Sequence, residues 1–487
     1  SRYFYIGVPC VLCGILGIYF AYSKFFVTQE QEVVRATVAP FIRGDVVINN
    51  YVNGQLVDDA PSQGTGYKVD KIVCDNGAVG EWNVRDWGLT ISNVSKRSKC
   101  NIYFVDVEKI NIGNVAVPLD NYGFCPSVND DGSVNVTEAE SQYDYLCKAK
   151  DAYGDSYYYR GNVTNNYVKF GEWQVRKYFG YYSDNSNDYH MYDSLEECQN
   201  ASSYNKKCAV GIDIGTPMYW RIIRINGDGT VRVIYDGISA YANGDRSADR
   251  QIGTSIFNDF DSSNNVSPGD DIPPVIHLRG NDNAHVGYMY GKTGASTYAE
   301  THANTNNSTI KTYLDTWYEN NIKGTSNEQY VKDNLFCNDR SLSSSNSGTG
   351  VGRSQTSYGR AGFNLKCPQQ NDAFTVSDTT NGNGALTYGV GLVTIDEVYL
   401  AGGWSSKNVN YYLYSGSEYW TMSPDRFYDR FAGERIVYYN GSTTSHEPVA
   451  GGVHGNVINS RGARPVLNLS SDVLKNGNGT ASDPYHA

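Results

Sequence analysis

Residues 218–235 read MYWRIIRINGDGTVRVIY, and this stretch decides the fold expected for the main domain. Two runs rich in Ile, Val, Tyr and Trp flank the four residues Asn-Gly-Asp-Gly, which tolerate the positive φ angles of a tight turn. The stretch therefore predicts an antiparallel hairpin. Arg221 and Arg224 interrupt the alternation of polar and apolar positions, so we expect one face of the first strand to be only partly buried.

The composition of the whole chain favours the same kind of structure. Its 487 residues include 41 Tyr and 50 Gly but only 14 Pro and 4 Met, which favours strands and turns over long helices. This length predicts two or three domains. The net charge of −12 argues against nucleic acid as a partner, because phosphate binding requires a basic surface.

The first residues differ from the rest of the chain. Residues 3–26 read YFYIGVPCVLCGILGIYFAYSKFF, without a charged side chain between Arg2 and Lys24. About 20 apolar residues cross a bilayer as a helix, so the segment predicts a transmembrane anchor that continues as a juxtamembrane helix. A cleaved signal peptide is the alternative, but no small-residue cleavage site precedes the charged residues 29–35. Cys10 and Cys13 are interpreted as membrane-embedded or lipidated thiols.

The remaining eight cysteines fall into pairs of sequence neighbours. None has the spacing of a zinc site and none adjoins a histidine, so we expect local disulfides in an oxidising exterior, with reduced structural cysteines as the alternative. The expected pairs are Cys74 with Cys100, Cys125 with Cys147, Cys198 with Cys208, and Cys337 with Cys367. They predict a protein anchored in the cell membrane with its body outside the cell.

The predicted fold class is α+β, with a transmembrane helix, a small β-sandwich stalk and a mixed main domain of antiparallel strands and a few short helices. A short helix is expected to start within residues 193–197. Ser308 is expected to cap a second helix, and Thr394 a third through a T-x-x-E capping box. The expected segments are the anchor and juxtamembrane helix (1–35), an Ig-like β-sandwich (36–107), a disulfide-looped connector (108–151), the main domain (152–475) with an insertion (171–217), and a polar tail (476–487).

The stretch 404–469 is the expected binding site. Its two apolar ends bracket residues rich in Tyr, Asn, Ser, Gly, Asp, Arg and His, which is typical of a scaffold that displays a polar, aromatic surface. Trp420, Met422 and residues 466, 467 and 469 are expected in the core, and only one of the adjacent Tyr411 and Tyr412 needs to be exposed. The residues expected to contact a ligand are Trp404, Tyr411, Tyr414, Arg426, Phe427, Tyr428, Arg430, Tyr438, Tyr439, Asn440 and His454.

Several ordered motifs between residues 157 and 485, outside the insertion, resemble a known family. They are YWRIIRINGDGT (219–230), FCNDR (336–340), GLVTIDEV (391–398), YWTMSP (419–424) and RPVLNL (464–469). They resemble the uncharacterised DUF6273 family of cell-surface domains from gut Firmicutes and Mollicutes-like bacteria. That family is similar to the C-type-lectin-like fold of formylglycine-generating enzymes and of the variable proteins of diversity-generating retroelements.

The resemblance implies a binding surface late in the chain, which a retroelement diversifies in the variable proteins. Those proteins close with an Arg-containing strand, as residues 462–466 do here. It does not imply formylglycine-type oxidation, because that activity needs a copper-binding cysteine pair late in the fold and no cysteine follows Cys367.

No catalytic motif stands out in the sequence. Neither H-E-x-x-H nor G-x-S-x-G occurs, and the carboxylates that could serve glycoside hydrolysis, at 425, 429, 434 and 447, are expected as solvated loop charges. His446 and His454 are likewise expected to be solvated rather than metal-bound. We assign no cofactor and no metal site, although a structural calcium ion without an assigned position is compatible with the sequence.

The predicted function is therefore a membrane-anchored bacterial adhesin or receptor that binds an extracellular protein or glycan and is not an enzyme. Two other classes of function stay open. One is a self-associating structural subunit of a surface filament or coat, and the other is an extracellular hydrolase.

Overall fold

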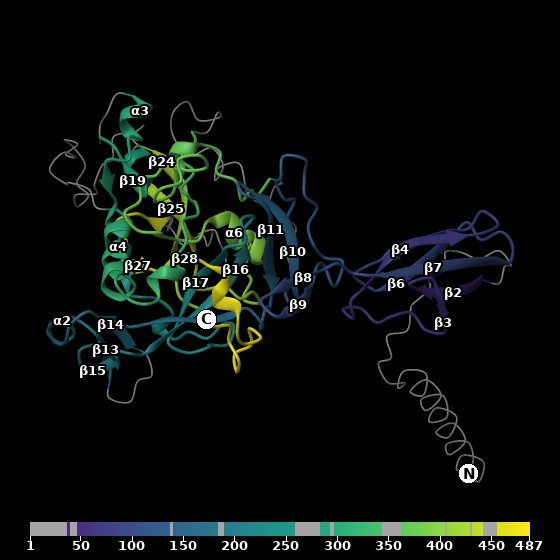
Figure 1. The fold of residues 1–487 in the computed structure, drawn as a ribbon, viewed down its shortest axis with the longest axis horizontal. Helices are drawn as coiled ribbons and strands as arrows, with labels where there is room; N and C mark the ends of the chain where they lie inside the picture. The colour runs from purple at the N-terminus through teal and green to yellow at the C-terminus, as the bar shows by residue number, and fades with distance from the viewer. Residues whose placement is uncertain are drawn as a thin grey trace, which may run out of the picture. The chain divides into compact units, whose positions relative to one another are not determined.

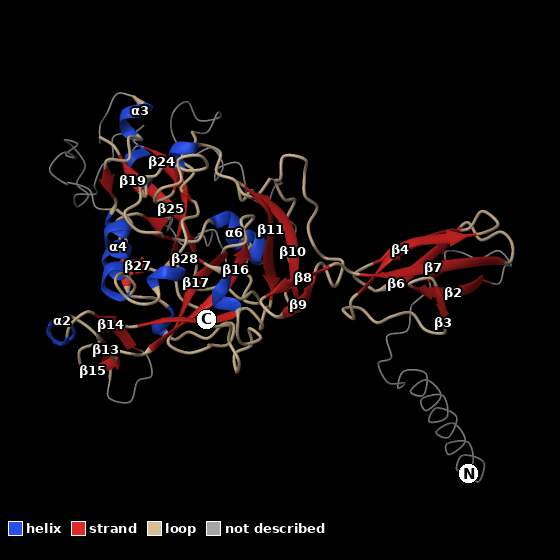
Figure 2. Cartoon of the chain, in the orientation of Figure 1, coloured by secondary structure: helices blue, strands red, loops and turns tan. Residues whose placement is uncertain are grey.

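The computed structural model describes residues 37–38, 46–136, 140–183, 189–258, 283–292, 297–342, 362–404, 407–428, 431–441 and 455–487. The chain divides into two compact units, which Figures 1 and 2 show. The first unit comprises Ser1–Val107 and Asn121–Phe124, and the second comprises Glu108–Asp120 and Cys125–Ala487.

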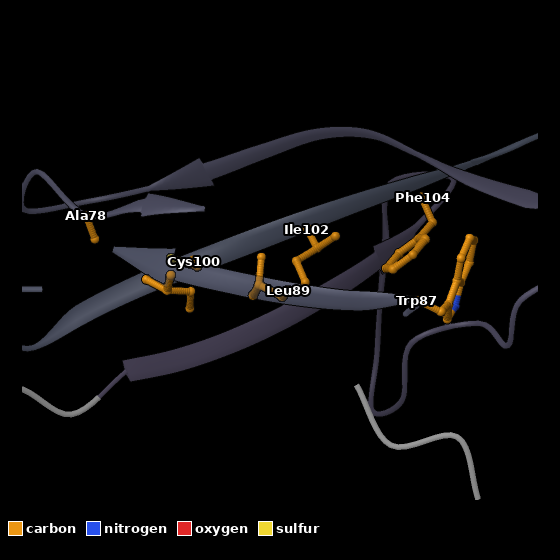
Figure 3. Close-up of a cluster of buried hydrophobic side chains, with 7 residues drawn as sticks. Ala78, Trp87, Leu89, Cys100, Ile102 and Phe104 are labelled. Carbon is orange, nitrogen blue, oxygen red and sulfur yellow. The ribbon is translucent and has the colours of Figure 1, made fainter. Parts of the chain in front are cut away.

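The first unit contains two β-sheets. One has the strand order β1 (Thr37–Val38), β6 (Gly88–Ser92), β5 (Val79–Asn83), and the other has the order β3 (Gln55–Val57), β2 (Val46–Val52), β7 (Ser98–Asp106), β4 (Tyr67–Cys74). Strands β2 and β7 run parallel, whereas β4 runs antiparallel to β7. Alternate side chains of β6 and β7 form the core together with Trp87, as Leu89, Ile102 and Phe104 illustrate (Figure 3).

The second unit is built on a sheet of seven strands. The order is β10-β11-β16-β17-β28-β23, and β12 also pairs with β16. The bounds are β10 (Asp144–Asp151), β11 (Gly154–Gly161), β12 (Tyr167–Glu172), β16 (Pro217–Ile225), β17 (Val231–Gly237), β23 (Val390–Gly391) and β28 (Val466–Leu469).

A second sheet of five strands carries most of the expected binding stretch. Its order is β18 (Thr254–Ser255), β27 (Arg461–Gly462), β24 (Tyr419–Tyr428), β25 (Phe431–Val437), β26 (Gly455–Asn456). Four smaller sheets are β14 (Tyr189–Tyr192) with β13 (Lys177–Tyr181) and β15 (Lys207–Ile212), β19 (Met289–Tyr290) with β20 (Asn306–Asn307), β21 (Phe336–Cys337) with β22 (Ala373–Phe374), and β8 (Lys109–Ile112) with β9 (Val115–Pro118).

The helices in the described ranges are short, and both expected capping residues, Ser308 and Thr394, cap one. Ser194 accepts a hydrogen bond from the Glu197 amide, Ser308 from the Lys311 amide, and Thr394 forms the expected capping box. The α-helices are α2 (Leu195–Asn200), α3 (Tyr298–Thr301), α4 (Thr309–Asn321) and α6 (Ile395–Ala401). The 3-10 helices are η1 (Ala248–Arg250), η3 (Asn283–Val286), η4 (Glu328–Tyr330), η5 (Gln370–Asp372) and η6 (Ser471–Leu474).

The predicted α+β class is therefore wrong. Strands hold 39% of the residues and helices only 12%, so the chain is mostly β-sheet. The physical reason is that short runs of β-branched and aromatic residues between glycine-containing turns leave room for helices of at most 13 residues in the described chain. The predicted architecture also included a transmembrane helix. That part is corrected as well, because no helix in the described ranges is long and apolar enough to span a membrane. Residues 1–36 lie outside those ranges.

The structure contains four disulfides, in the same pairs that the sequence predicts. They are Cys74–Cys100, Cys125–Cys147, Cys198–Cys208 and Cys337–Cys367. Disulfides persist in oxidising compartments, so these four indicate an oxidising environment such as the cell exterior.

The opening hairpin is confirmed as β16 and β17, but its arginines are not where the alternation placed them. The turn closes through the Asn226 amide, which donates to the Thr230 carbonyl at 2.8 Å, and Gly229 adopts a φ of +83°. Arg221 and Arg224 are fully buried, so the expectation of a partly exposed face is wrong. Both guanidinium groups are buried because carboxylates are buried with them.

Asp236, at the end of β17, is the counter-ion of Arg221 and of two further arginines, Arg250 and Arg464. Its Oδ1 accepts hydrogen bonds from Arg250 Nη2 at 2.7 Å and from Arg464 Nη2 at 2.6 Å. Arg221 Nη1 lies 3.9 Å from Oδ2, which is ion-pair distance but too long for a hydrogen bond. All four side chains are fully buried, and they come from β16, β17, η1 and the segment before β28.

A second buried cluster joins the same sheet to α6. Arg224 Nη1 donates to Asp151 Oδ2 at 2.6 Å and Arg224 Nε to Glu397 Oε1 at 3.1 Å. Arg232 Nε lies 2.5 Å from the same Oε1 of Glu397. Burial acts to raise the pKa of Glu397, but Arg232 and Arg224 outweigh it and the net shift is downward. The glutamate of the capping box is therefore also the counter-ion of two core arginines.

The predicted polar tail is part of the fold. Tyr485 is fully buried and forms a β-bridge with Val168 of β12. Its amide donates to the Tyr167 carbonyl at 2.9 Å, and the Tyr167 amide donates to the Gly479 carbonyl at 2.8 Å. The buried Tyr485 side chain and these backbone hydrogen bonds together dock an otherwise polar segment.

Replacing Asp236 should destabilise the larger unit strongly. We expect Asp236→Asn to lower the free energy of unfolding by about 3–5 kcal/mol, because it leaves three buried guanidinium groups without their counter-charge. The matched control is Asp213→Asn, which breaks the exposed ion pair with Arg176 and should cost less than about 1 kcal/mol. Urea unfolding followed by tryptophan fluorescence measures both, and equal costs would contradict this role of Asp236.

Candidate binding site

The hairpin of β24 and β25 forms the centre of the expected binding stretch (Figure 1). Its register runs from Tyr419 opposite Val437 to Tyr428 opposite Phe431, with irregularities on both sides of Pro424. Proline has no amide proton to give to the ladder, so a bulge at this point is expected. Trp420 and Met422 are fully buried, as are Val466, Leu467 and Leu469, which confirms the sequence prediction for these core positions.

The tyrosines that precede the hairpin are buried as well, which the sequence did not predict. Tyr411, Tyr412 and Tyr414 are all at most 3% exposed, so Tyr411 and Tyr414 are not available to touch a ligand. Each hydroxyl instead donates to a backbone carbonyl. Tyr411 reaches Gly441 at 3.2 Å, Tyr412 reaches Ile223 at 3.4 Å and Tyr414 reaches Tyr439 at 2.9 Å.

Two of these hydroxyls hold the turn that follows β25, which we call the display turn (residues 438–441). The turn closes through the Gly441 amide, which donates to the Tyr438 carbonyl at 2.8 Å. Gly441 has a φ of +81°, and a Cβ at this position would collide with the carbonyl oxygen of Asn408. Only glycine fits here, so the turn is fixed by its own backbone and by the tyrosines beneath it.

The display turn carries three of the predicted contact residues to the surface. Tyr439 is 49% exposed, and Tyr438 and Asn440 are half-buried. The rings of Tyr438 and Tyr439 lie 4.2 Å apart at an angle of 44°. The turn therefore presents an aromatic pair and an amide in one fixed arrangement.

The other predicted contacts lie elsewhere or outside the described residues. Trp404 is half-buried and packs its ring edge-to-face on Tyr399, at 5.6 Å between ring centres. Arg426, Phe427 and Tyr428 pair along β24 with β25, and the structure describes only their backbone. Arg430 and His454 lie outside the described residues. The structure thus groups Tyr438, Tyr439 and Asn440. Tyr411 and Tyr414 are buried and hold the display turn through their hydroxyl groups.

The carboxylates of the hairpin contradict the expectation of solvated loop charges. Asp425 and Glu434 are both buried, and Arg435 Nη2 forms an ion pair with Asp425 Oδ1 at 2.8 Å. Glu434 is only 1% exposed, and neither of its oxygens has a hydrogen-bond partner among the residues that the structure describes. Burial therefore raises the pKa of Glu434 well above its ordinary value, Asp425 raises it further, and Arg340 acts in the opposite direction. Asp429 and Glu447 lie outside the described residues.

The larger unit also contains a small cavity between the second ion-pair cluster and α6. Its volume is about 20 Å³, and Arg224, Arg232, Asp339, Asp396 and Glu397 are among its lining residues. This volume holds about one water molecule, so the cavity is too small for an organic ligand. Within the described ranges, no three His, Cys, Asp or Glu side chains are grouped so as to hold a metal ion.

Comparison with known proteins adds no assignment. No family model, curated protein or solved structure matches this chain. The resemblance drawn from the sequence motifs therefore stays a prediction.

The sequence contained a signal for the buried tyrosines. Residues 408–417 read NVNYYLYSGS and contain no charged side chain, unlike the segments on either side. A charge-free run with three tyrosines and a leucine favours burial, because tyrosine is amphipathic and buries well once its hydroxyl finds a partner. Which carbonyls accept those hydroxyls follows only from the tertiary structure.

The stability of the chain should respond to pH through Glu434. Its pKa is higher in the folded than in the unfolded state, so its contribution is fully present below the unfolded pKa of about 4.3 and is lost as the pH rises towards the folded pKa. We expect stability to fall by up to about 1.4 kcal/mol per pH unit over that window. Urea unfolding of the wild type and of Glu434→Gln at pH 5, 6 and 7 isolates this contribution.

The amide variant should flatten this slope and gain stability relative to the wild type as the pH rises. The control is Glu196→Gln, which changes an exposed side chain in the same unit and should leave the slope unchanged. A slope that persists in Glu434→Gln would show that another group titrates.

Proposed function

We propose that this chain is an extracellular binding protein that captures a protein or glycan ligand through the display turn. The observation that carries this proposal is the half-exposed ring of Tyr439 on a turn that two buried tyrosine hydroxyls hold from beneath. The four disulfides support the extracellular location, because disulfides persist in oxidising compartments such as the cell exterior.

The rigidity of the turn is what makes it suitable for binding. Ordering a flexible, side-chain-rich surface costs about 0.5–1.5 kcal/mol per immobilised side chain, and a turn that is already ordered avoids much of this cost. Tyrosine offers a large contact area with few rotatable bonds, and an adjacent asparagine offers adaptable hydrogen bonds. Tyr438, Tyr439 and Asn440 combine both kinds of contact in consecutive positions.

The sequence resemblance supports the same class of function. The motifs resemble those of the DUF6273 family of cell-surface domains, and the variable proteins to which that family is similar place their diversified residues late in the chain. The display turn lies in that part of the chain, between β25 and β26.

Removing the Tyr439 ring should weaken binding strongly without unfolding the protein. In a screen of defined oligosaccharides and purified extracellular proteins, we expect Tyr439→Ala to lose about 2 kcal/mol of binding free energy, or roughly thirtyfold in affinity, for every ligand that the wild type retains. Its stability should change by no more than about 0.5 kcal/mol, because the ring is half exposed.

The matched control is Tyr182→Ala, which removes the same side chain from a position that is 66% exposed in the same unit. This variant should bind like the wild type. Tyr411→Phe keeps the buried ring but removes the hydroxyl that holds Gly441, so it should weaken binding through the turn at a stability cost of about 1 kcal/mol. Wild-type affinity in Tyr439→Ala would refute the proposal.

A further inference from the structure

We propose that the first unit serves to resist tension along the chain, and that its strands β2 and β7 carry the force. This goes beyond the function proposed for the display turn, which belongs to the other compact unit. The proposal does not depend on what the display turn binds, so the two can be tested separately in the same chain.

Strands β2 and β7 are the first and the last strand of the four-stranded sheet (Figure 1). The chain enters this sheet at Val46, the first residue of β2, and leaves it at Asp106, the last residue of β7. The two strands run parallel in an unbroken register, from Val46 opposite Ser98 to Val52 opposite Phe104. Because they are parallel, the points of entry and exit lie at opposite ends of the strand pair.

Tension at these two points loads the pair in shear. The force pulls β2 along β7, so the evenly spaced hydrogen bonds of the parallel pair share the load and must break together. Strands β4 and β7 of the same sheet are arranged differently. They run antiparallel, and the chain enters β4 at Tyr67, directly opposite Asp106, where it leaves β7. Force at that end opens the antiparallel pair one bond at a time, so this pair yields more easily.

Side chains reinforce the pairing of β2 with β7. Asn49 Nδ2 donates to Asn101 Oδ1 at 2.9 Å, and these two residues are direct partners in the register. Tyr51 and Tyr103, which are also direct partners, stack their rings at 4.9 Å between centres and 15° between planes. Cross-strand pairs of this kind add to the stability of a sheet. Both pairs join the two strands that shear would separate.

The residue that follows β2 extends these contacts. The Asn53 amide donates to the Phe104 carbonyl at 2.9 Å, and Asn53 Nδ2 donates to Asp106 Oδ2 at 2.9 Å. On the inner side of β7, Ile102 and Phe104 are fully buried together with Leu89 (Figure 3). Strand β7 is thus held in the core of the unit while β2 is pulled along it.

The disulfide of this unit determines which strand moves and how far the unit can extend. Cys74 and Cys100 are direct partners on β4 and β7, so β7 is covalently fixed to its other neighbour and β2 is the strand that slides. The two cysteines are 26 residues apart, so about 90 Å of chain cannot extend after β2 detaches. Strands β5 and β6 lie within this closed loop. The unit therefore yields by a limited length and stays cross-linked.

The test is single-molecule force spectroscopy on the purified full chain, with the pulling handles attached at two chosen side chains. Handles at Val47 and Glu108 load β2 against β7 in shear, whereas handles at Lys68 and Glu108 open β4 from β7; all three side chains are exposed. At one constant force, we expect the unit to survive at least about tenfold longer in the first direction, because forced unfolding depends on the unfolding rate along the pulled path. Equal lifetimes in the two directions, or a shorter one in shear, would overturn the proposal.

The double variant Asn49→Ala/Tyr51→Ala removes both side-chain contacts between β2 and β7. It should shorten the lifetime in shear by about tenfold and leave the lifetime in the other direction unchanged, because β2 is not pulled there. The matched control is Val79→Ala/Asn83→Ala, which changes two exposed residues of β5 inside the disulfide loop and should alter neither lifetime. Equal losses in both directions would show a general loss of stability and contradict the proposed role of the pair.

The disulfide provides a separate measurement of length. Reducing the wild type, or replacing the pair in Cys74→Ala/Cys100→Ala, should lengthen the extension in shear by about 90 Å. No other cysteine lies between the handles at Val47 and Glu108, so this added length identifies the first unit. An unchanged extension would show that the observed step does not release this loop and would refute the assignment. Tyr439→Ala should leave every one of these values unchanged, which separates the role of the first unit from that of the display turn.

Discussion

The larger unit depends on one buried carboxylate, Asp236, and on the arginines that surround it. Arg250 and Arg464 both bond to the same carboxylate oxygen, and Arg221 lies at ion-pair distance from the other. One negative charge cannot balance three positive ones, so the arginines also donate to neutral oxygens: Arg464 to the carbonyls of Tyr235 and Leu413, and Arg250 to that of Asp245. The cluster is held as much by carbonyl dipoles as by charge pairing.

The candidate binding site is connected to this cluster through the backbone. Arg464 Nη1 donates to the Leu413 carbonyl at 3.0 Å, and the Tyr419 hydroxyl donates to the same oxygen at 2.8 Å. Leu413 lies between the tyrosines whose hydroxyls hold the display turn. Hydrogen bonds therefore link Asp236 through Arg464 to the backbone at Leu413, and the adjacent Tyr414 donates to the carbonyl of Tyr439. This explains how a surface turn between two strands is fixed without a disulfide or a metal ion of its own among the described residues.

The two compact units use aromatic side chains in different ways. In the display turn, the ring of Tyr439 is exposed and offers contact area, whereas Tyr411 and Tyr414 serve only as support. On the four-stranded sheet of the first unit, Tyr51 and Tyr103 stack against each other, and the Lys71 ammonium lies over the Tyr103 ring. The many tyrosines therefore do not form one surface. Some present an exposed ring, some stack against a neighbouring ring, and some are buried with their hydroxyl bonded to a backbone carbonyl.

The sequence by itself determined the local features of this protein. Several features follow from short-range patterns and occur in the structure: the Asn-Gly-Asp-Gly hairpin, the caps at Ser308 and Thr394, the four disulfides, and the burial of Trp420 and Met422. The fold class could not be predicted from these patterns. Alternating apolar runs and helix caps do not show how few residues remain for helices once the strands have paired.

Only the tertiary structure decided where the charges and tyrosines lie. From the sequence, Arg221 is expected on a partly buried face, and Asp425 and Glu434 are expected as solvated charges, since a lone charge is almost always solvated. Asp236 is hundreds of positions away from Arg464, and residues 411 and 414 find their acceptors about 25 to 30 positions later. A polar group can be buried without a large energetic cost only when a hydrogen-bonding or charged partner is buried beside it. Partners this distant in sequence are brought together by the pairing of the sheets and not by the local pattern.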